Sequence, residues 1–529
     1  MVSPAAQTGT VSDTEVPVLI VGGGPVGLTA RALLGRWGVR SLLVEKYREL
    51  SPFPRSRLLN VRSMEIFRQL GIAGRVAAAA FAPEYARVRF RETLGAEDFA
   101  SAPMLGVHAP VPESPALGAV TSQDRLEPIL LGAADTRVRF GAELVDLAEE
   151  TDHVVASLVD DGTERKVRAR YVIAADGANS TVREWLGIDT LGPGAVGSFT
   201  TVVFNADLRF ENEPGGAYFT THGSFTPIYP EGGWAWFGPT PAEPRHADWR
   251  ELVTRALGPG IELPIDVLRV QHWVMNAFVA SRFAAGRVLL AGDAVHAIPP
   301  IGGLGMNVGL ADVHNLCWKL AGVLHGWAGP GLLDSYQAER LPVARETLEL
   351  AVANSQLVRR VQQQRVERPE APVEVPWTRR YFAQLGLVLG AAYESDAVLP
   401  DGSVAPSAAD PVTDYLPTAR PGHRLPHQWL AEGRSTLDIL GEWFTLLTAD
   451  LDCWRGRVGG AAPLRVTELT VEQASHYELG PGGAVLVRPD GYVAARWPDA
   501  PAGDALRSAI SVVTSGAGDQ VAVADLTGR

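Results

Sequence analysis

A glycine-rich turn between an apolar strand and a helix constrains this chain more than any other sequence feature. The run Val16–Val21 is short, apolar and rich in β-branched residues, as in a buried parallel strand. Residues 22–27 (GGGPVG) follow with the spacing GxGxxG, and residues 26–37 then show helical spacing of apolar positions. A second apolar run, 40–45, reads as the next strand and ends in a glutamate. The pattern predicts a βαβ unit at the start of a Rossmann-like α/β fold.

Each glycine of this turn has a physical reason to be there. Gly22 permits a tight turn, Gly24 lets backbone amides approach a pyrophosphate, and Gly27 lets the helix pack closely on the strand. The helix N-terminus offers unpaired N–H groups to phosphates. Glu45 at the end of the second strand can accept hydrogen bonds from a ribose. The motif predicts a dinucleotide site but does not separate FAD from NAD.

Two further motifs follow later strands. Residues 174–183 (AADGANSTVR) come after an apolar strand, and their Asp-Gly pair alone would indicate only a turn. Residues 286–296 (GRVLLAGDAVH) again join a strand to Gly-Asp, and 299–307 (PPIGGLGMN) form a loop of prolines and glycines. Asp293 can hold a ribitol hydroxyl, and the bare N–H groups of the loop can stabilise negative charge on a reduced flavin.

The three motifs, in this order, resemble those of the class A flavoprotein monooxygenases, which share the p-hydroxybenzoate hydroxylase fold. The resemblance covers the first two-thirds of the chain strongly. Pro54-Arg55 resembles the family's Pro-Arg segment, and 123–130 resembles its Q-x-x-L-E-x-x-L helix. Motifs and resemblance together predict these FAD contacts: Gly22, Gly24, Pro25, Gly27, Glu45, Lys46, Arg55, Gln123, Asp176, Gly177, Gly292, Asp293, Pro300, Gly303, Gly305, Met306 and Asn307.

The resemblance also implies a reaction. Only one GxGxxG is present, so NADPH or NADH would bind transiently without its own Rossmann domain. Reduced FAD would react with O2 to give a C4a-hydroperoxide, which hydroxylates an electron-rich aromatic or polycyclic compound. Baeyer–Villiger or ring-rearranging oxygenation of a similar substrate stays open, as does a flavin reductase or dehydrogenase. A flavin-bearing structural or sensor protein is disfavoured by the full motif set.

The last third of the chain narrows the family. Residues 420–427 (RPGHRLPH), 435–438 (STLD) and 487–491 (VRPDG) resemble the thioredoxin-like appendage of larger members. Those members include phenol hydroxylases and the hydroxylases of bacterial aromatic polyketide pathways, which act in antibiotic biosynthesis. The appendage has no cysteine pair here, so dithiol chemistry is excluded and a structural or subunit-contact role is favoured.

Three domains are expected from changes in the sequence pattern. Alternating apolar residues from Gly197 onward indicate an antiparallel sheet inserted into the α/β fold, and a long helical stretch, 309–364, is interrupted near 327–331. A strand is expected at 436–440. The predicted division is a discontinuous FAD-binding domain (1–80, 106–196 and 281–400), a substrate-binding sheet domain (81–105 and 197–280) and a thioredoxin-like domain (401–529).

The substrate side of the site is less defined. Since the cofactor carries the chemistry, no catalytic triad is needed and none is found. Pro300 would stiffen one wall of the site. His296 could face the flavin, although a hydrogen-bonded structural histidine is favoured. Side chains that could act as a substrate base are Tyr218, His222, Tyr229 and His272, although a core or surface role is favoured for each of them. An apolar substrate wall could comprise Tyr229, Trp234, Trp236 and Phe237, with a packed sheet as the equal alternative.

The composition excludes several classes of function. The chain has 529 residues and a net charge of −13, whereas nucleic-acid binding needs a basic surface. The two cysteines, Cys317 and Cys453, lie in no metal-binding or disulfide pattern. No secretory or membrane-spanning pattern is found. We therefore expect a cytoplasmic enzyme, monomeric or homodimeric, that binds neither nucleic acid nor membranes.

Overall fold

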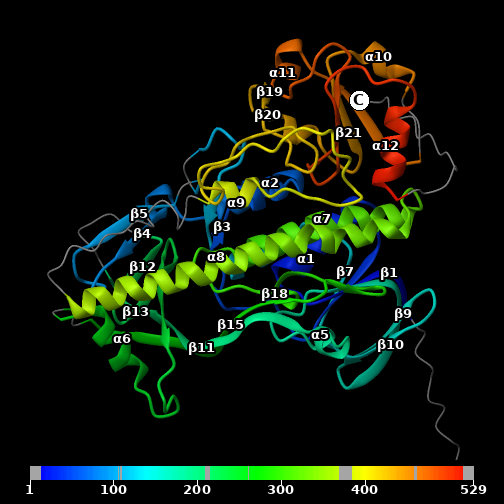
Figure 1. Cartoon of the computed structure of the whole chain (residues 1–529). Coiled ribbons are helices and arrows are strands. Elements are labelled where there is room, and N and C mark those ends of the chain that lie inside the picture. Colours follow the sequence, from blue (N-terminus) through cyan, green and yellow to red (C-terminus); the bar gives the residue numbers. More distant parts are fainter. Residues whose placement is uncertain are drawn as a thin grey trace, which may run out of the picture.

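The structure is a computed structural model with mixed α/β architecture (Figure 1). The expected fold class, a Rossmann-like α/β unit with an inserted sheet and a thioredoxin-like C-terminal unit, is confirmed. The structure describes residues 14–104, 106–107, 110–208, 215–259, 261, 263–368, 384–457 and 461–515.

The first sheet brings the three sequence motifs to one edge. Its centre is parallel, in the order β17-β10-β1-β2-β7, with β16 at one end and β8 and β9 attached through β10. In the register, Val21 lies beside both Val44 and Ala174, and Ala174 lies beside Leu290. The strands are β1 (Thr14–Val21), β2 (Ser41–Glu45), β7 (Arg137–Phe140), β8 (Ala142–Glu149), β9 (Val154–Asp160), β10 (Thr163–Ala174), β16 (Ala284–Ala285) and β17 (Val288–Leu290). Because parallel strands end at the same edge, the turns after them share one crevice.

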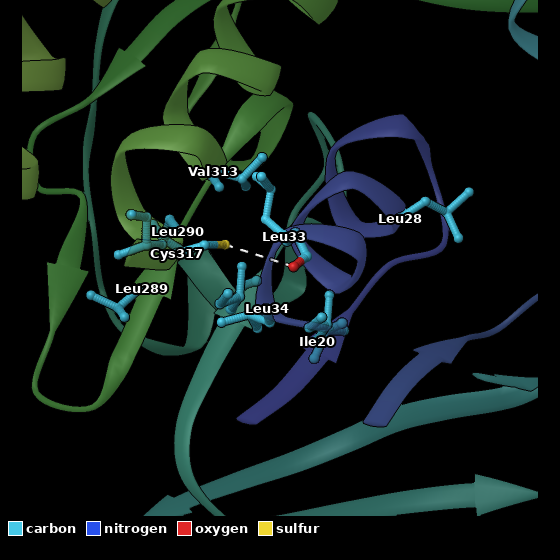
Figure 2. Close-up of a cluster of buried hydrophobic side chains, with 14 of the residues drawn as sticks. Ile20, Leu28, Leu33, Leu34, Leu289, Leu290, Val313 and Cys317 are labelled. Carbon is cyan, nitrogen blue, oxygen red and sulfur yellow. Dashed lines mark hydrogen bonds between the residues drawn. The ribbon is translucent and has the colours of Figure 1, made fainter. Parts of the chain in front are cut away.

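Two helices pack on this sheet and form the main core with it. Helix α1 (Pro25–Arg36) follows β1, and α7 (Gly305–His325) follows the third motif. Figure 2 shows Ile20 of β1, Leu33 of α1 and Leu289 of β17 packed around Cys317 of α7. The Cys317 thiol is buried and donates to the Ala30 carbonyl at 3.7 Å, so it serves packing. This core fixes α1 and α7 relative to the strand ends.

The second sheet is mostly antiparallel and has the order β18-β15-β11-β14-β13-β12-β4-β5. Helix α6 (Trp249–Leu257) packs on one of its faces. Strand β18 lies within the third motif, before its proline- and glycine-rich loop, and pairs with β15, so this sheet is hydrogen-bonded to the cofactor loop. The strands are β4 (Arg87–Phe90), β5 (Ala100–Pro103), β11 (Thr190–Asn205), β12 (Ala217–Thr220), β13 (Gly223–Tyr229), β14 (Gly232–Pro239), β15 (Asp266–Ala280) and β18 (His296–Ala297).

The long helical stretch is interrupted as expected. Helix α7 is followed by Gly326 in the left-handed conformation (φ +78°), and α8 (Asp334–Glu367) then runs along the molecule (Figure 1). The remaining elements before α9 are η1 (Pro83–Tyr85), β3 (Leu58–Leu59), α2 (Val61–Gln69), α3 (Ala73–Ala78), β6 (Ala119–Val120), α4 (Gln123–Leu131), α5 (Thr181–Trp185), η2 (Gly292–Ala294) and η3 (Pro330–Leu333). No helix among the described residues is long and apolar enough to cross a membrane.

The C-terminal sheet has the order β22-β21-β23-β24, with β21 and β22 parallel and the other pairs antiparallel. Helices follow β21, β22 and β24, which is the thioredoxin-like connection. In Figure 1 these elements, orange to red, lie above α7. The elements are α9 (Leu385–Leu389), β19 (Trp429–Ala431), β20 (Arg434–Ser435), β21 (Phe444–Thr448), α10 (Leu451–Arg455), β22 (Leu464–Glu468), α11 (Val471–Ser475), β23 (Ala484–Val487), β24 (Val493–Trp497) and α12 (Ala505–Val513).

The strand expected at 436–440 is wrong. Residues Thr436–Ile439 form a short 3-10 helix, η4. The Ser435 hydroxyl accepts from the Leu437 amide, and the Asp438 carboxylate accepts from the Ser435 amide. This capping box turns the backbone, which apolar alternation alone does not reveal.

Candidate functional site

The glycine turn at residues 22–27 leaves an open place at the start of α1. A Cβ on Gly22, whose φ is +108°, would lie 2.3 Å from the Ala175 carbonyl oxygen. A Cβ on Gly27 would lie 2.0 Å from the Gly22 carbonyl oxygen. Gly24, in contrast, has nothing within 4 Å of its Cβ position. Two glycines are therefore required by the protein's own packing, and the third leaves room that a phosphate group would fill.

Glu45 closes the same crevice from the end of β2. Its carboxylate accepts from the Gly23 amide at 2.6 Å and from the Tyr47 amide at 2.9 Å. The Gly23 contact orients the side chain toward the glycine turn, and the Tyr47 contact fixes its other oxygen. Lys46 is exposed, with its ammonium 5.4 Å from the Tyr47 ring centroid.

The second motif is held together by its own side chains. Asp176 accepts from the Ser180 hydroxyl at 2.7 Å and from the Val182 amide at 3.2 Å. Arg183 donates to the Ala294 carbonyl at 2.9 Å and so ties this motif to the third one. Gly177 has a φ of +87° and nothing within 4 Å of its Cβ position. The Asp176 side chain thus fixes the turn and leaves the backbone near Gly177 open.

In the third motif, Gly292 and Asp293 differ in what they face. A Cβ on Gly292 would meet the Val26 side chain at 2.9 Å, which explains the glycine. Asp293 is exposed in this structure and accepts no hydrogen bond from the described residues. Enough protein surrounds it that desolvation raises its pKa, although His296 and Arg55 lower it. A carboxylate in such a place can accept a hydrogen bond from a ligand hydroxyl.

His296 points into the protein and is hydrogen-bonded there. Its Nε2 lies 2.6 Å from Asp312 Oδ2, and both side chains are fully buried. Asp312 also accepts from the Gly292 amide at 3.2 Å and from Arg340 Nε at 2.9 Å. Sequence reasoning missed Asp312 and Arg340, because they lie on the inner sides of α7 and α8 and belong to no motif that we identified.

The side chain of Asn307 ties the loop to the start of α2. Its amide donates to the Leu58 carbonyl at 2.9 Å and to the Gly303 carbonyl at 2.6 Å. Its carbonyl oxygen accepts from the Asn60 amide at 3.0 Å and from the Ser63 hydroxyl at 2.6 Å. Only its backbone therefore remains for a ligand.

The loop leaves open space at Gly305, whereas Gly303 is closely packed. The nearest atoms to a Cβ on Gly305 lie 3.7 Å away, so the helix start at Gly305-Met306 can be approached closely. Gly303 has a φ of +66°, and a Cβ there would lie 2.7 Å from Leu58 Cβ. Pro300 is exposed.

The loop from Tyr47 to Arg57 is attached to α4. Glu127 accepts from the Ser51 amide at 3.2 Å and from Gln123 Nε2 at 2.7 Å. Burial raises the pKa of Glu127 to about 7, although the hydrogen bonds and Arg55 act against the shift. Arg55 is exposed and lowers the pKa of both Glu127 and Asp293, so it lies near both carboxyl groups. The structure thus brings Arg55 and Gln123 to the crevice expected to hold FAD.

Three of the four candidate bases have a side-chain partner in this structure, and the fourth, His222, is exposed. The Tyr229 hydroxyl donates to Asp124, and burial with this contact raises the pKa of Tyr229 to about 12. The Tyr218 hydroxyl accepts from the Gly215 amide at 2.8 Å and is buried. His272 Nδ1 lies 2.8 Å from the Thr200 hydroxyl. The backbone carbonyl of His222 accepts from Trp236 Nε1 at 2.9 Å.

The two faces of β14 have different surroundings. Trp234 and Trp236 are buried in an apolar cluster with Leu257 of α6. The residue between them, Ala235, lies on the opposite face of the sheet, as alternation requires. There it packs with Val203, Ile228, Tyr229 and Phe53, the last from the 47–57 loop. Phe237 is two residues beyond Ala235 and shares its face.

The residues present fit a dinucleotide cofactor with a long polar linker. The crevice offers an open glycine turn at a helix start, an exposed carboxylate without a partner among the described residues, and an exposed guanidinium. Among the described residues, no group of three or more His, Cys, Asp or Glu side chains is placed to hold a metal ion.

Comparisons with known proteins give the same cofactor. A family model described as "FAD binding domain" matches residues 15–351, and one described as "Aromatic-ring hydroxylase, C-terminal" matches 418–516. The chain is 35% identical to aklavinone 12-hydroxylase RdmE of Streptomyces purpurascens, covering 93% of this chain and 97% of that protein. It is 35% identical to a putative polyketide hydroxylase of Streptomyces halstedii, covering 93% and 95%.

A solved structure agrees over the whole length. The flavin-dependent monooxygenase PieE, in complex with FAD and substrate, superposes with a TM-score of 0.87 at 33% identity. The match covers 96% of this chain and 100% of PieE. The C-terminal unit is therefore shared as well as the cofactor fold.

Proposed function

Because the chain belongs to the FAD-dependent aromatic-ring hydroxylases, a family of flavin monooxygenases, we propose that it hydroxylates a polycyclic, polyketide-derived aromatic compound. The observation that carries the substrate class is the match, over nearly the full length of both chains, to hydroxylases named for aklavinone and for polyketides. The co-substrates are O2 and either NADPH or NADH. FAD, when bound and reduced, supplies the oxygen-transfer chemistry.

This chain's residues bind the cofactor and shape the substrate side. Gly24, the start of α1 and Arg55 bind the phosphates, Glu45 binds the ribose, and Asp293 binds a hydroxyl of the ribityl chain. What supports these roles is the open space at Gly24 and the unpartnered, exposed Asp293 carboxylate among the described residues. The other contacts are made by Pro25, Lys46, Gln123, Asp176, Gly177, Gly292, Pro300, Gly303, Gly305, Met306 and the Asn307 backbone.

The substrate lies between the cofactor loop and the inner face of the second sheet. Val203, Ile228 and Ala235 give that face small and branched apolar side chains, suited to a flat ring system. Phe53 packs against it from the 47–57 loop. Phe237 and Tyr229 extend this wall, whereas Trp234 and Trp236 support the sheet from its other face. The exposed Pro300 borders the site on the cofactor side. His296 is buried behind the cofactor loop, and its hydrogen bond to Asp312 supports that loop.

The three-domain division stays part of this proposal. What supports it is that β4 and β5 complete the same sheet as β11 to β15, although β6 to β10 separate the two groups in the chain.

 Strand β4 pairs with β12 in parallel, although β5 to β11 come between them in the chain. The thioredoxin-like unit has its own four-stranded sheet. We also propose that the enzyme is cytoplasmic, is a monomer or homodimer, and binds neither nucleic acid nor membranes, which its acidic balance supports.

The test uses purified holoenzyme with a panel of polycyclic phenols and one single-ring phenol as comparison. We expect a polycyclic phenol to accelerate NADPH or NADH oxidation and to gain one labelled oxygen atom from ¹⁸O2 as a new ring hydroxyl. A lactone or ring-opened product, recognised by its fragmentation, would move the assignment to a Baeyer–Villiger or ring-rearranging oxygenase. Reduction of O2 without labelled product across the panel would overturn oxygenation of this substrate class.

A further inference from the structure

Two arginines of the C-terminal unit point into the protein. Arg424 and Arg488 belong to the segments 420–427 and 487–491, and their exposed fractions are 1% and 0%. The two segments lie side by side, since the Leu425 amide donates to the Gly491 carbonyl at 2.9 Å. Neither segment has a role in the chemistry proposed above. Buried guanidinium groups need partners, and both find them outside the C-terminal unit.

Arg424 binds a glutamate of α2. Its Nε and Nη2 donate to the Glu65 carboxylate at 3.0 and 2.5 Å, and Arg62 Nη1 and the Ser114 hydroxyl donate to the same group at 3.0 and 2.6 Å. Burial raises the pKa of Glu65, but Arg424 and Arg62 outweigh it and hold the pKa below its ordinary value. Glu65 is therefore an ionised carboxylate whose position depends on Arg424.

Arg488 binds a glutamate of α8 in the same way. Its two Nη atoms donate to the Glu339 carboxylate at 2.6 and 2.8 Å. Lys319 of α7 donates to Glu339 at 2.7 Å, and Asp490 accepts from Arg488 at 2.5 Å. All four side chains are at most 1% exposed, so two cations and two anions balance in the interior.

Both glutamates are close in sequence to residues that belong to hydrogen-bonded paths to the cofactor loop. On α2, Ser63 lies two residues before Glu65 and donates to Asn307, which holds the loop at Gly303. On α8, the residue after Glu339 is Arg340, which donates to Asp312. Asp312 in turn accepts from the Gly292 amide. The path through Glu65 therefore reaches the end of the stretch from Gly292 to Asn307, and the path through Glu339 reaches its beginning.

We propose that Arg424 and Arg488 are positioning residues for the cofactor site, acting through Glu65 and Asn307 on one path and through Glu339, Arg340 and Asp312 on the other. A buried ion pair adds little net stability compared with apolar packing, so domain attachment alone is a weak reason for two of them. A better reason for the two buried ion pairs is that their directional hydrogen bonds fix a loop, because a cofactor contact is sensitive to small displacements. The proposal rests on the assignment of residues 292–307 to FAD and not on the substrate.

The experiment uses paired substitutions that keep the buried charge balanced. Arg488→Met with Asp490→Asn removes one cation and one anion and leaves Glu339 with Lys319. Arg424→Met with Glu65→Gln removes one of each on the other path, and Arg62 keeps its hydrogen bond to the Asp490 carbonyl. We expect each pair to raise the FAD dissociation constant of the apoprotein about ten-fold or more and to change the visible circular dichroism of bound flavin. Cooperative unfolding of the apoprotein should persist.

A matched control tests whether the loss of any ion pair between the C-terminal unit and α2 weakens FAD binding. Arg68, also on α2, donates to both oxygens of Asp438 at 2.5 and 2.8 Å, but this pair is partly exposed and leads to no cofactor residue. Arg68→Met with Asp438→Asn should leave FAD affinity within about two-fold. A loss as large as that of the buried pairs would overturn the positioning role.

Two further outcomes decide the proposal. If the folded paired variants bind FAD with the parent affinity and the parent dichroism, the arginines only attach the C-terminal unit and the proposal is wrong. If those variants do not fold, Arg488→Lys and Arg424→Lys keep the charge but lose the two-pronged contact, and unchanged FAD affinity in both would equally refute it. The FAD affinity of Asp293→Ala is measured alongside. Normal affinity in that variant would show that the 292–307 loop does not bind FAD and would overturn this proposal, whereas the substrate assay would be unaffected.

Discussion

At the residue scale, the three glycines of the first turn do different work. Gly22 and Gly27 have backbone atoms within 2.3 Å of their Cβ positions, while Gly24 has open space. Gly24 also has a negative φ (−74°), which alanine can adopt. The protein's own packing therefore explains Gly22 and Gly27, and only a ligand explains Gly24.

We predict that Gly24→Ala and Gly27→Ala separate cofactor binding from folding. Gly24→Ala should leave the stability of the apoprotein within about 0.5 kcal/mol and weaken FAD binding about ten-fold or more, because the methyl group stands where a phosphate approaches. Gly27→Ala should cost about 2 kcal/mol or more, since its methyl group meets a carbonyl oxygen. Urea unfolding and FAD titration check both. Tight FAD binding by Gly24→Ala would remove the phosphate assignment.

Glu127 gives a second prediction at the residue scale, which concerns how the free energy of unfolding depends on pH. Its pKa of about 7 lies above the ordinary value, so the folded state keeps this proton to higher pH than the unfolded chain. The stability it contributes is complete below about pH 4.3 and is lost as the pH rises through 7. Glu127→Gln, which stays neutral, should remove this loss.

The measurement compares the apoproteins at pH 5.5 and pH 8. Relative to Glu127→Gln, the parent should lose on the order of 2 kcal/mol of unfolding free energy between these values. His314, whose pKa burial lowers to about 3, works in the opposite direction but is present in both proteins and cancels. Equal pH dependence in the two proteins would show that Glu127 does not titrate there.

At the element scale, the loop from Tyr47 to Arg57 joins both sheets. It is bound to α4 through Glu127 and to β15 through Arg269, whose Nη1 donates to the Pro52 carbonyl at 2.6 Å. The Arg269 guanidinium also lies 5.9 Å from the Phe53 ring centroid. The loop thus covers the space between the cofactor crevice and the inner face of the second sheet.

We predict that Arg269→Ala loosens this loop without unfolding the protein. The contact is exposed, so the cost in stability should stay below about 1 kcal/mol. Release of FAD should become faster by about three-fold or more, because the loop opens more often. Recovery of flavin fluorescence after dilution measures this rate. Arg255→Ala, which removes an exposed ion pair on α6, is the control, and equal release rates in the two variants would contradict the prediction.

The elements also show what the sequence could and could not predict. Strand, turn and helix at Gly22–Gly27 were predictable because the spacing follows from local backbone needs. The strand expected at 436–440 failed because a capping box overrode the apolar alternation. Asp312 and Arg340 were missed because their roles arise only when α7 and α8 pack together. Local chemistry was readable, and contacts between distant segments were not.

At the scale of the whole molecule, the C-terminal unit shares its core with the cofactor fold. Trp318 of α7 packs edge-on against Phe444 of β21, with ring centroids 5.7 Å apart, and Trp327 lies 6.1 Å from the same ring. The cluster continues to Trp454 and to residues of α12. An interface with an apolar core and buried ion pairs resembles a domain interior more than a contact between mobile domains.

We therefore predict one cooperative unfolding transition for the apoprotein. Units that share a core and balance each other's buried charges cannot unfold separately without exposing both. Trp318→Ala should lower the whole transition, with a loss of about 3 kcal/mol or more, whereas Trp429→Ala, at an exposed position of the C-terminal unit, should change it little. Calorimetry, with tryptophan fluorescence as a second probe, checks this. Two resolved transitions, of which Trp318→Ala shifts only one, would mean that the C-terminal unit is an independent domain and that its arginines cannot hold the cofactor loop continuously.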